Sequence, residues 1–224
     1  LKILGIPVYN DGYSIEKSVD KGMTSFLLNN AGLNTPLTWV LKDRLEALAI
    51  AEQELALGHK LISKPLFGSQ GEGVRRLEKT TDLLWLTSSN GIYYLQRFVE
   101  CKGQGYSDIR VFVVYGKAIA AMRRCGKSWL NNVARGAKCE AIELDEELNT
   151  LAIQAAKALS MDYAGVDIIK DKNGQYSIIE VNSIPAWKGL ETVCKYNIAE
   201  ILADDLIGRY LNSNNSALKI AAAC

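Results

Sequence analysis

The order of apolar and polar residues along the chain predicts a mixture of helices and strands. Apolar residues recur at helical spacing in 15–31, 145–159 and 198–211, and Asp43 can cap a further helix that runs to Leu57. Gly32 and Gly58 follow two of these segments, where glycine commonly ends a helix. Strands are expected where β-branched and aromatic residues gather, in 61–64, 91–99, 109–115, 117–122, 163–170 and 175–181. Because helices and strands do not alternate strictly, this order favours an α+β fold over a doubly wound parallel sheet.

The hairpin expected around Asn173-Gly174 brings three polar side chains together. Asn-Gly is a strong signal for a two-residue type I′ turn. With that turn, Asp167 faces Glu180 across the two strands. Asn182 comes two residues after Glu180, so its side chain points to the same face of the sheet.

The two acidic residues of this hairpin indicate a metal site. Carboxylates directly opposite each other, with Cβ atoms about 5 Å apart, repel and destabilise a sheet. The neighbouring positions are mostly Val, Ile and Ala, so the strands are expected to be buried. Buried like charges persist if one is protonated or if a cation lies between them. A divalent cation such as Mg²⁺ or Mn²⁺ takes oxygen ligands and fits Asp167, Glu180 and Asn182. The alternative is a surface hairpin whose acids point into water.

A glycine-rich stretch directly follows the strand expected over 61–64. Lys64 ends that strand, and Gly68, Gly71 and Gly73 follow it. Glycines let the backbone approach an anion closely and direct N–H groups at it, while the lysine adds a positive charge. The stretch is not a Walker A loop, since it lacks the terminal Lys-Ser/Thr pair of that motif. It indicates either a phosphate-binding loop or a mobile surface loop.

Basic and amide side chains gather between the expected central strands and the hairpin. They are Arg110, Arg123-Arg124, Lys127, Asn131-Asn132 and Arg135. Taken alone, such a run is typical of a solvated basic face. Together with a phosphate loop and an acidic metal pair, it supplies the third part of a phosphoryl-transfer site.

Composition and charge exclude several classes of protein. The chain has 224 residues, enough for one large domain or for two lobes that share an interface. Its 26 Lys and Arg residues balance 25 Asp and Glu residues, which argues against generic nucleic-acid or membrane-surface binding. His59 is the single histidine, which argues against a His-based zinc site, a Ser-His-Asp triad and a Cys-His dyad. No two of the five cysteines have two-residue spacing, and no apolar run has transmembrane length, so we expect reduced thiols in a cytoplasmic protein.

Several short motifs follow one another in a fixed order along the chain. They are Lys64 with Gly68-Ser69-Gln70-Gly71, Gln96-Arg97-Phe98-Val99-Glu100, Asp108-Ile109-Arg110, Asn131-Asn132 with Arg135-Gly136, Ala164-Gly165-Val166-Asp167-Ile168, and Glu180-Val181-Asn182-Ser183 with Pro185. In this order they resemble the motifs of ATP-grasp ligases. The likeness is to the RimK type, the amino-acid ligases that add glutamate to a carboxyl terminus, and it runs from about Asp11 to the closing helix.

The resemblance implies an ATP-grasp fold, in which two α+β lobes grip the nucleotide. It places an N-terminal lobe with the glycine-rich phosphate loop at 16–98 and a C-terminal lobe with the metal-binding hairpin at 99–212. Residues 1–15 are then a remnant of a preceding domain or a linker, and 213–224 are a tail. The domain that precedes the grasp in this family is expected to be largely missing.

The resemblance also assigns roles to individual residues. It implies ATP and two Mg²⁺ or Mn²⁺ ions as cofactors, and the metal ligands are Asp167, Glu180 and Asn182. The implied catalytic residues, of which the arginines stabilise the transferring phosphoryl group and the tetrahedral oxyanion, are Arg110, Arg124 and Asn132. The implied nucleotide contacts are Lys21, Lys64, Gly68, Ser69, Gly71 and Gly73 at the phosphates, Gln96, Arg97, Phe98 and Val99 at the adenine, and Asp108.

The reaction implied by the resemblance is an ADP-forming ligation of a carboxylate with an amine. ATP phosphorylates the carboxylate to an acyl phosphate, which the amino group of an amino acid such as L-glutamate attacks. The implied partners are ATP, an amino acid and a carboxylate acceptor on a protein, a peptide or a cofactor tail. A homodimer and a tetramer are both open. Two alternatives remain: a nucleotide-binding regulatory module without turnover, and an enzyme that stops at phosphate transfer.

Two departures from the family pattern lie near the expected acceptor and acyl-phosphate pockets. Leu130 stands where the family often has arginine. Ile184-Pro185-Ala186-Trp187 stands where the family usually has Ser-Pro-Gly after the metal asparagine. Both changes bear on the identity of the substrate more than on ATP binding.

Overall fold

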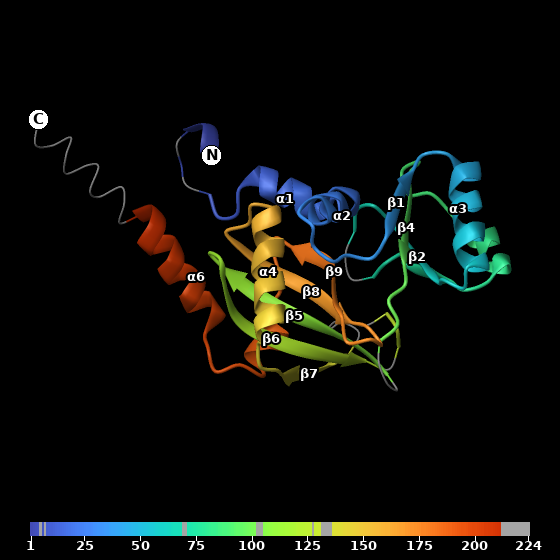
Figure 1. Cartoon of the computed structure of the whole chain (residues 1–224). Coiled ribbons are helices and arrows are strands. Elements are labelled where there is room, and N and C mark those ends of the chain that lie inside the picture. The colour runs from blue at the N-terminus through green and yellow to red at the C-terminus, as the bar shows by residue number, and fades with distance from the viewer. Residues whose placement is uncertain are drawn as a thin grey trace, which may run out of the picture.

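Two antiparallel sheets and the helices that cover them make up the described part of the chain. The structure is a computed structural model and describes residues 1–4, 6, 8–68, 71–101, 105–126, 128–130 and 136–211. The sheets lie side by side in Figure 1, with α3 and α6 at opposite ends of the molecule. The α+β fold predicted from the sequence is confirmed.

The first sheet has the strand order β1-β4-β2-β3. Its strands are β1 (Thr38–Leu41), β2 (Leu61–Lys64), β3 (Arg75–Leu77) and β4 (Tyr93–Arg97). Helix α3 (Arg44–Ala56) covers one face, where Ala47 and Ala51 pack in one apolar cluster with Leu95. A 3₁₀ helix (Thr80–Trp85) lies between β3 and β4 along the chain. The opposite face of this sheet lines a cleft.

The second sheet has the strand order β7-β6-β5-β8-β9. Its strands are β5 (Tyr106–Val114), β6 (Lys117–Gly126), β7 (Lys138–Ala141), β8 (Tyr163–Lys170) and β9 (Tyr176–Asn182). Helices α4 (Glu146–Ala158) and α2 (Lys21–Asn30) cover one face, and α4 crosses it in Figure 1. Leu28 and Leu148 of these helices form the main core with Val111 and Val166 of the sheet.

The other face of the second sheet is apolar at one end and charged at the other. Alternate residues of a strand point to opposite faces, so Asp108, Arg110 and Phe112 of β5 share a face. Phe112 packs under the short helix α5 (Lys188–Glu191) and under α6 (Ile198–Leu206), which a π-helical turn over Ile207–Leu211 extends. Asp108 and Arg110 line the cleft instead. One alternating strand therefore supplies both core and site.

The helix predicted over 15–31 is instead two helices, α1 (Gly12–Val19) and α2, which break at Asp20. The carboxylate of Asp20 accepts a hydrogen bond from the N–H of Met23 (2.9 Å) and so caps α2. The break was not predicted, because apolar residues keep their helical spacing through it and Asp20 lies at a polar position of that pattern. The break makes Lys21 the first residue of α2, next to the glycine-rich loop.

The remaining helices begin and end close to the predicted residues. Asp43 caps α3, and Gly58 follows it in the left-handed region with φ +81°. Gly32 follows α2 in the same way, with φ +71°. The sequence did not predict β1, β3 and β7, because strands of three or four residues are too short to show a period. A 3₁₀ turn over Lys2–Leu4 precedes α1.

The chain passes from the first sheet to the second between Arg97 and Tyr106, close to the predicted lobe boundary. Helix α2 precedes both sheets, and its Leu28 packs in the core of the second. The division of the chain into lobes stays a prediction. In the described residues Cys101, Cys125, Cys139 and Cys194 are free thiols. Among those residues, none of the helices combines the length and apolar character needed to cross a membrane.

The β8–β9 hairpin closes with a three-residue loop, so the predicted two-residue turn is wrong. The N–H of Asp171 bonds the carbonyl of Gln175, and the Asp171 carboxylate accepts the N–H groups of Asn173 and Gln175, each at 2.8 Å. Gly174 takes a left-handed φ of +88°, whereas a type I′ turn would require a positive φ of Asn173 as well. Pairing near the loop is therefore shifted by one residue from the prediction.

A β-bulge at Ile179 restores the predicted pairing where the polar residues lie. Ile168 pairs with Ile178, but Asp167 pairs with Glu180, so Ile179 is an extra residue in β9. Ile178 packs in the core, whereas Ile179 and Glu180 both line the cleft. The bulge thus shifts the alternation of faces by one residue. The predicted pairing of Asp167 with Glu180 is confirmed, because the loop and the bulge offset each other.

We predict that Gly174→Ala destabilises the protein without blocking the cleft. A left-handed backbone costs an L-residue about 1–2 kcal/mol, and an added Cβ at Gly174 would have only Lys170 Cε nearby, at 3.9 Å. The thermal midpoint should fall by about 2–4 °C per kcal/mol for a chain of this size. Gly12→Ala is the control, since Gly12 lies in α1 with open space around it. Equal midpoints for the two variants would contradict the three-residue loop.

Candidate active site

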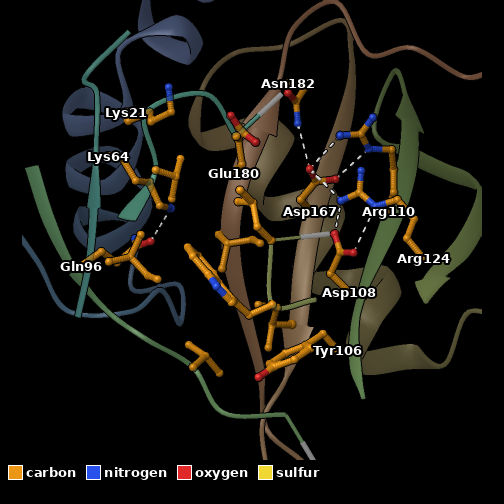
Figure 2. Close-up of a pocket in the computed structure, with 18 of the residues that line it drawn as sticks. Lys21, Lys64, Gln96, Tyr106, Asp108, Arg110, Arg124, Asp167, Glu180 and Asn182 are labelled. Atoms are coloured by element: carbon orange, nitrogen blue, oxygen red, sulfur yellow. Dashed lines mark hydrogen bonds and ion pairs between the residues drawn. The ribbon is translucent and has the colours of Figure 1, made fainter. Parts of the chain in front are cut away.

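A cleft of about 640 Å³ lies between the two sheets. Lys64 and Gln96 line it from the first sheet, and Asp167 and Glu180 line it from the second. Figure 2 shows the lysines and the charged cluster on facing walls. The site therefore depends on how the two sheets face each other, and neither sheet contains it alone.

On the first wall, Lys64 and Gln96 belong to a buried polar network. Lys64 Nζ donates to Gln96 Oε1 (2.7 Å), and Gln96 Nε2 donates to Thr38 Oγ1 (3.0 Å) and to the Tyr94 hydroxyl (3.1 Å). The Tyr94 hydroxyl also lies 2.9 Å from Ser25 Oγ of α2. Gln96 is 2% exposed and Tyr94 is 1% exposed, so both side chains have little freedom. The network fixes the Lys64 ammonium at the surface of the cleft.

The lysines of this wall are poised to receive an anion. Burial lowers the pKa of Lys64 to about 8, an effect that the Glu180 carboxylate opposes and the Lys21 ammonium adds to. Burial also lowers the pKa of Lys21. An anion between the two ammonium groups would stabilise their charged forms and reverse both shifts.

The glycine-rich loop is tied to α2 and to the segment 128–130. Lys21 Nζ donates to the carbonyl of Gly68 (2.8 Å), so it is held against the loop. Gly71 has φ +71°, and an added Cβ would lie 2.8 Å from Leu130 Cδ1. Gly73 has φ +68°, and an added Cβ would lie 2.7 Å from Pro65 Cγ. Glycine is thus required here both by conformation and by close approach.

On the facing wall, two arginines hold the carboxylate of Asp167. Arg110 donates from Nε and Nη2 to its two oxygens, both at 2.7 Å, and Arg124 Nη2 lies 3.1 Å from Oδ2. Arg124 also donates to both oxygens of Asp108. Burial disfavours the Asp167 anion, but the two guanidinium groups outweigh burial and lower the pKa of Asp167. Asp167 is therefore a buried carboxylate whose negative charge is balanced by the guanidinium groups of Arg110 and Arg124.

Glu180 faces Asp167 across the strands, and its carboxylate has no hydrogen bond or ion pair to any described residue. Burial raises the pKa of Glu180, and the nearby Asp167 carboxylate raises it further, while the lysines of the other wall oppose the shift. Its carboxyl group is thus the least compensated charge on this wall. A cation beside it would stabilise the ionised form.

The donors on this wall fit a hard divalent cation. Asn182 Nδ2 lies 3.3 Å from Asp167 Oδ2, so the amide stands next to the paired carboxylates. Two carboxylates and an amide oxygen are the ligand types that Mg²⁺ and Mn²⁺ prefer. Within the described residues, no cluster of three His, Cys, Asp or Glu side chains could hold a metal ion.

The structure brings most of the predicted site residues to the cleft. Arg97 lines the cleft, but its guanidinium donates two hydrogen bonds, of 2.6 and 3.0 Å, to the carboxylate of Glu54 in α3. Ser69 and Asn132 lie outside the described residues, and Gly73 lies under Pro65. The predicted residues that line the cleft are Lys21, Lys64, Gly68, Gly71, Gln96, Arg97, Phe98, Val99, Asp108, Arg110, Arg124, Asp167, Glu180 and Asn182. Their roles toward a ligand stay predictions.

An aromatic group near the end of the cleft was missed by sequence reasoning. The ring of Trp129 meets Phe98 edge-on, with centroids 6.2 Å apart, and Arg76 lies over both rings at 5.2 and 5.4 Å. Arg76 Nη1 also donates to the Tyr106 hydroxyl (3.4 Å). These residues come from separate segments of the chain, so no local sequence motif predicts that they lie together. Tyr94 was missed as well, although it shares a strand face with Gln96 and could have been found by that spacing.

In the cleft, lysines on one wall face a pair of carboxylates on the other. This is the arrangement expected of an ATP-grasp protein. Residues 18–206 match the RimK-like ATP-grasp domain family. The chain belongs to this family, which confirms the family and the fold predicted from the sequence.

Three of the proteins that this chain resembles are ligases. The chain is 35% identical to a tetrahydromethanopterin:alpha-L-glutamate ligase of Methanococcus maripaludis, over 90% of this chain and 70% of that protein. It is 29% identical to the alpha-aminoadipate–LysW ligase LysX of Saccharolobus solfataricus, over 90% and 74%. Its fold resembles the ATP-grasp ligase PsnB, solved with a phosphomimetic variant of its minimal precursor, Mg and ADP, with a TM-score of 0.69 and 26% identity. That match covers 92% of this chain and 64% of PsnB. The predicted ligase class is confirmed at the level of the family.

We predict that affinity for ATP falls as the pH rises from 7 to 9. Only the ammonium form of Lys64 attracts phosphates, and with a pKa of about 8 most free molecules lose that proton over this range. Binding must then restore the proton, so the affinity for a non-hydrolysable ATP analogue should fall about tenfold. Calorimetric titration measures the change.

Adenosine is the control ligand, because it has no phosphates and should bind equally at both pH values. Lys64→Gln should weaken binding of the analogue at pH 7 and remove most of its pH dependence. A wild-type affinity that does not change between pH 7 and 9 would contradict a phosphate role for Lys64.

Proposed function

We propose that the chain is an ADP-forming carboxylate–amine ligase whose substrates meet in the cleft between the two sheets. The observation that carries this proposal is the opposition of Lys64 and Lys21 to the group formed by Asp167, Glu180 and Asn182. A triphosphate between these walls meets ammonium groups on one side and a cation site on the other. Phosphoryl transfer needs this combination more than it needs a protein nucleophile.

The proposed reaction has two steps. An oxygen of the substrate carboxylate attacks the γ-phosphorus of ATP, which forms an acyl phosphate and releases ADP. The nitrogen of the amine then attacks the acyl carbon, a C–N bond forms, inorganic phosphate leaves, and the nitrogen loses a proton to solvent. The products are an amide, ADP and phosphate.

The side chains of the two walls supply the electrostatic part of catalysis. Lys64, fixed by Gln96, neutralises phosphate oxygens. Arg110 and Arg124 are held at the cleft by their carboxylate partners and offset negative charge on the transferring group. A bound Mg²⁺ or Mn²⁺ polarises phosphate oxygens as a Lewis acid. Asp167, Glu180 and Asn182 are the residues proposed to hold the metal, with two ions as the proposed number.

The amine is proposed to be an amino acid such as L-glutamate, and the acceptor a carboxylate on a protein, a peptide or a cofactor tail. The names of two relatives support an amino-acid substrate, alpha-L-glutamate in one and alpha-aminoadipate in the other. The acceptor differs between them, so the acceptor of this chain is to be found by screening. A cytoplasmic location and the oligomeric state stay predictions.

Release of ADP that depends on an added amino acid tests the proposal directly. Purified protein with Mg²⁺ and ATP is screened against amino acids and carboxylate acceptors, with ADP measured by a coupled assay and the amide by mass spectrometry. ADP and amide formed in equal amounts support a ligase. Binding of ATP without any ADP release supports a regulatory module. ADP formed without an amine supports an enzyme that stops at phosphate transfer.

We predict that Glu180→Gln abolishes turnover but leaves the fold intact. The change removes one carboxylate of an opposed pair, so the thermal midpoint should stay equal or rise. Loss of an anionic metal ligand should reduce ADP release by about a hundredfold or more at saturating Mg²⁺.

Glu143→Gln is the matched control, since Glu143 is exposed and lies outside the cleft. It should leave both the thermal midpoint and turnover unchanged. Near-normal activity of the Glu180 variant would sink the assignment of this residue to the metal.

A further inference from the structure

Asn10 lies outside the cleft and outside the residues matched to the family, yet its side chain is 5% exposed and fully bonded. Its Nδ2 donates to the carbonyls of Tyr163 and Ser183, both at 2.8 Å. Its Oδ1 accepts the N–H groups of Asp162 (2.6 Å) and Tyr163 (3.1 Å). A carboxamide has two donor hydrogens and two acceptor lone pairs, so all of its capacity is used.

These four bonds stand where the β8–β9 ladder ends. The last pair of that ladder is Gly165 with Asn182. Continued in the same register, the ladder would pair Tyr163 with Ile184, but β9 ends at Asn182 and the chain turns away at Ser183. The Asn10 carboxamide bonds the N–H and the carbonyl of Tyr163 in place of that strand residue.

The same amide also holds the turn that follows β9. Its bond to the carbonyl of Ser183 fixes the residue directly after Asn182. From the other side, Pro185 packs on Gly165 so closely that an added Cβ would lie 2.6 Å from Pro185 Cβ. Two separate contacts therefore set the direction in which the chain leaves β9.

We propose that Asn10 is a positioning residue for Asn182, and that its carboxamide sets the orientation of the metal-binding end of β9. The inference rests on the proposed function, because it takes Asn182 as a metal ligand. Asn10 touches neither substrate nor metal in this scheme. It acts by holding the backbone on both sides of the β9 terminus.

Asn10→Asp tests the inference with almost no change in shape. A carboxylate has no N–H to donate, so it would face the carbonyls of Tyr163 and Ser183 with negative charge. We expect the dissociation constant for Mn²⁺, measured by electron paramagnetic resonance in the presence of a non-hydrolysable ATP analogue, to rise tenfold or more. Affinity for the analogue without metal should change less than twofold.

Asn34→Asp is the matched control. Asn34 Nδ2 also donates to a backbone carbonyl of β9, that of Tyr176 (2.6 Å), but at the opposite end of the strand. This variant should keep the wild-type Mn²⁺ affinity. Asn10→Ala, which removes the four bonds without adding a charge, should weaken Mn²⁺ binding in the same direction and keeps the test valid if the Asp variant folds poorly.

Three results would overturn the inference: Mn²⁺ affinity unchanged in both Asn10 variants, an equal loss of metal and nucleotide binding, or the same loss in Asn34→Asp. Each would mean that Asn10 serves general stability only. A wild-type protein that binds Mn²⁺ but forms no amide would overturn the proposed function and leave the role of Asn10 in place. A wild-type protein that binds no Mn²⁺ with the analogue would remove both.

Discussion

The structure depends on one constraint in β9, which packs side chains into the core at one end and lines the cleft with polar side chains at the other. The alternation of its two faces must therefore shift part-way along the strand. In β9, Tyr176 and Ile178 fill the core, and a regular strand would then bury Glu180 as well. The extra residue Ile179 shifts the alternation, so Glu180 and Asn182 reach the cleft while Val181 returns to the core. With this three-residue loop and no bulge, Asp167 would not share one face with Glu180 and Asn182.

Each wall of the cleft carries a charged group, Lys64 on one and Glu180 on the other, whose charge is not fully compensated in the free protein. Lys64 is deprived of solvent and loses basicity, whereas Glu180 is deprived of solvent and gains it. Both shifts cost stability in the free protein, and both would be relieved by a nucleotide with its cation. Asp167 differs because Arg110 and Arg124 already compensate the negative charge of its carboxylate. Asp167 is therefore ionised in the absence of a ligand. The site thus joins one permanent ion cluster to groups whose charge depends on binding.

Leu130, which departs from the pattern that the resemblance implies, lies where the segment 128–130 meets the glycine-rich loop. This chain places the apolar side chain of Leu130 against Gly71 of the glycine-rich loop. Close by, Trp129 and Phe98 enclose Arg76, which lies on β3 next to that loop. The contact between the two segments is therefore made by packing as well as by charge.

The sequence by itself determined the α+β class, most helices and central strands, and most of the charged residues of the cleft, because these follow from periodicity, caps and ordered motifs. It indicated Asp167, Glu180 and Asn182 through the pairing of Asp167 with Glu180, which is confirmed. The two-residue turn from which that pairing was predicted is wrong. The turn at Gly174 and the bulge at Ile179 each shift the register by one residue, and the hairpin that contains both packs against α4 and α2. The break at Asp20, the Tyr94–Gln96–Lys64 network and the carboxamide of Asn10 were likewise decided by tertiary structure. The bond of Lys64 to Gln96 and the bonds of Asn10 to the backbone at 162–163 and 183 join residues far apart in the chain. A local pattern carries no information on which distant group a buried side chain must satisfy.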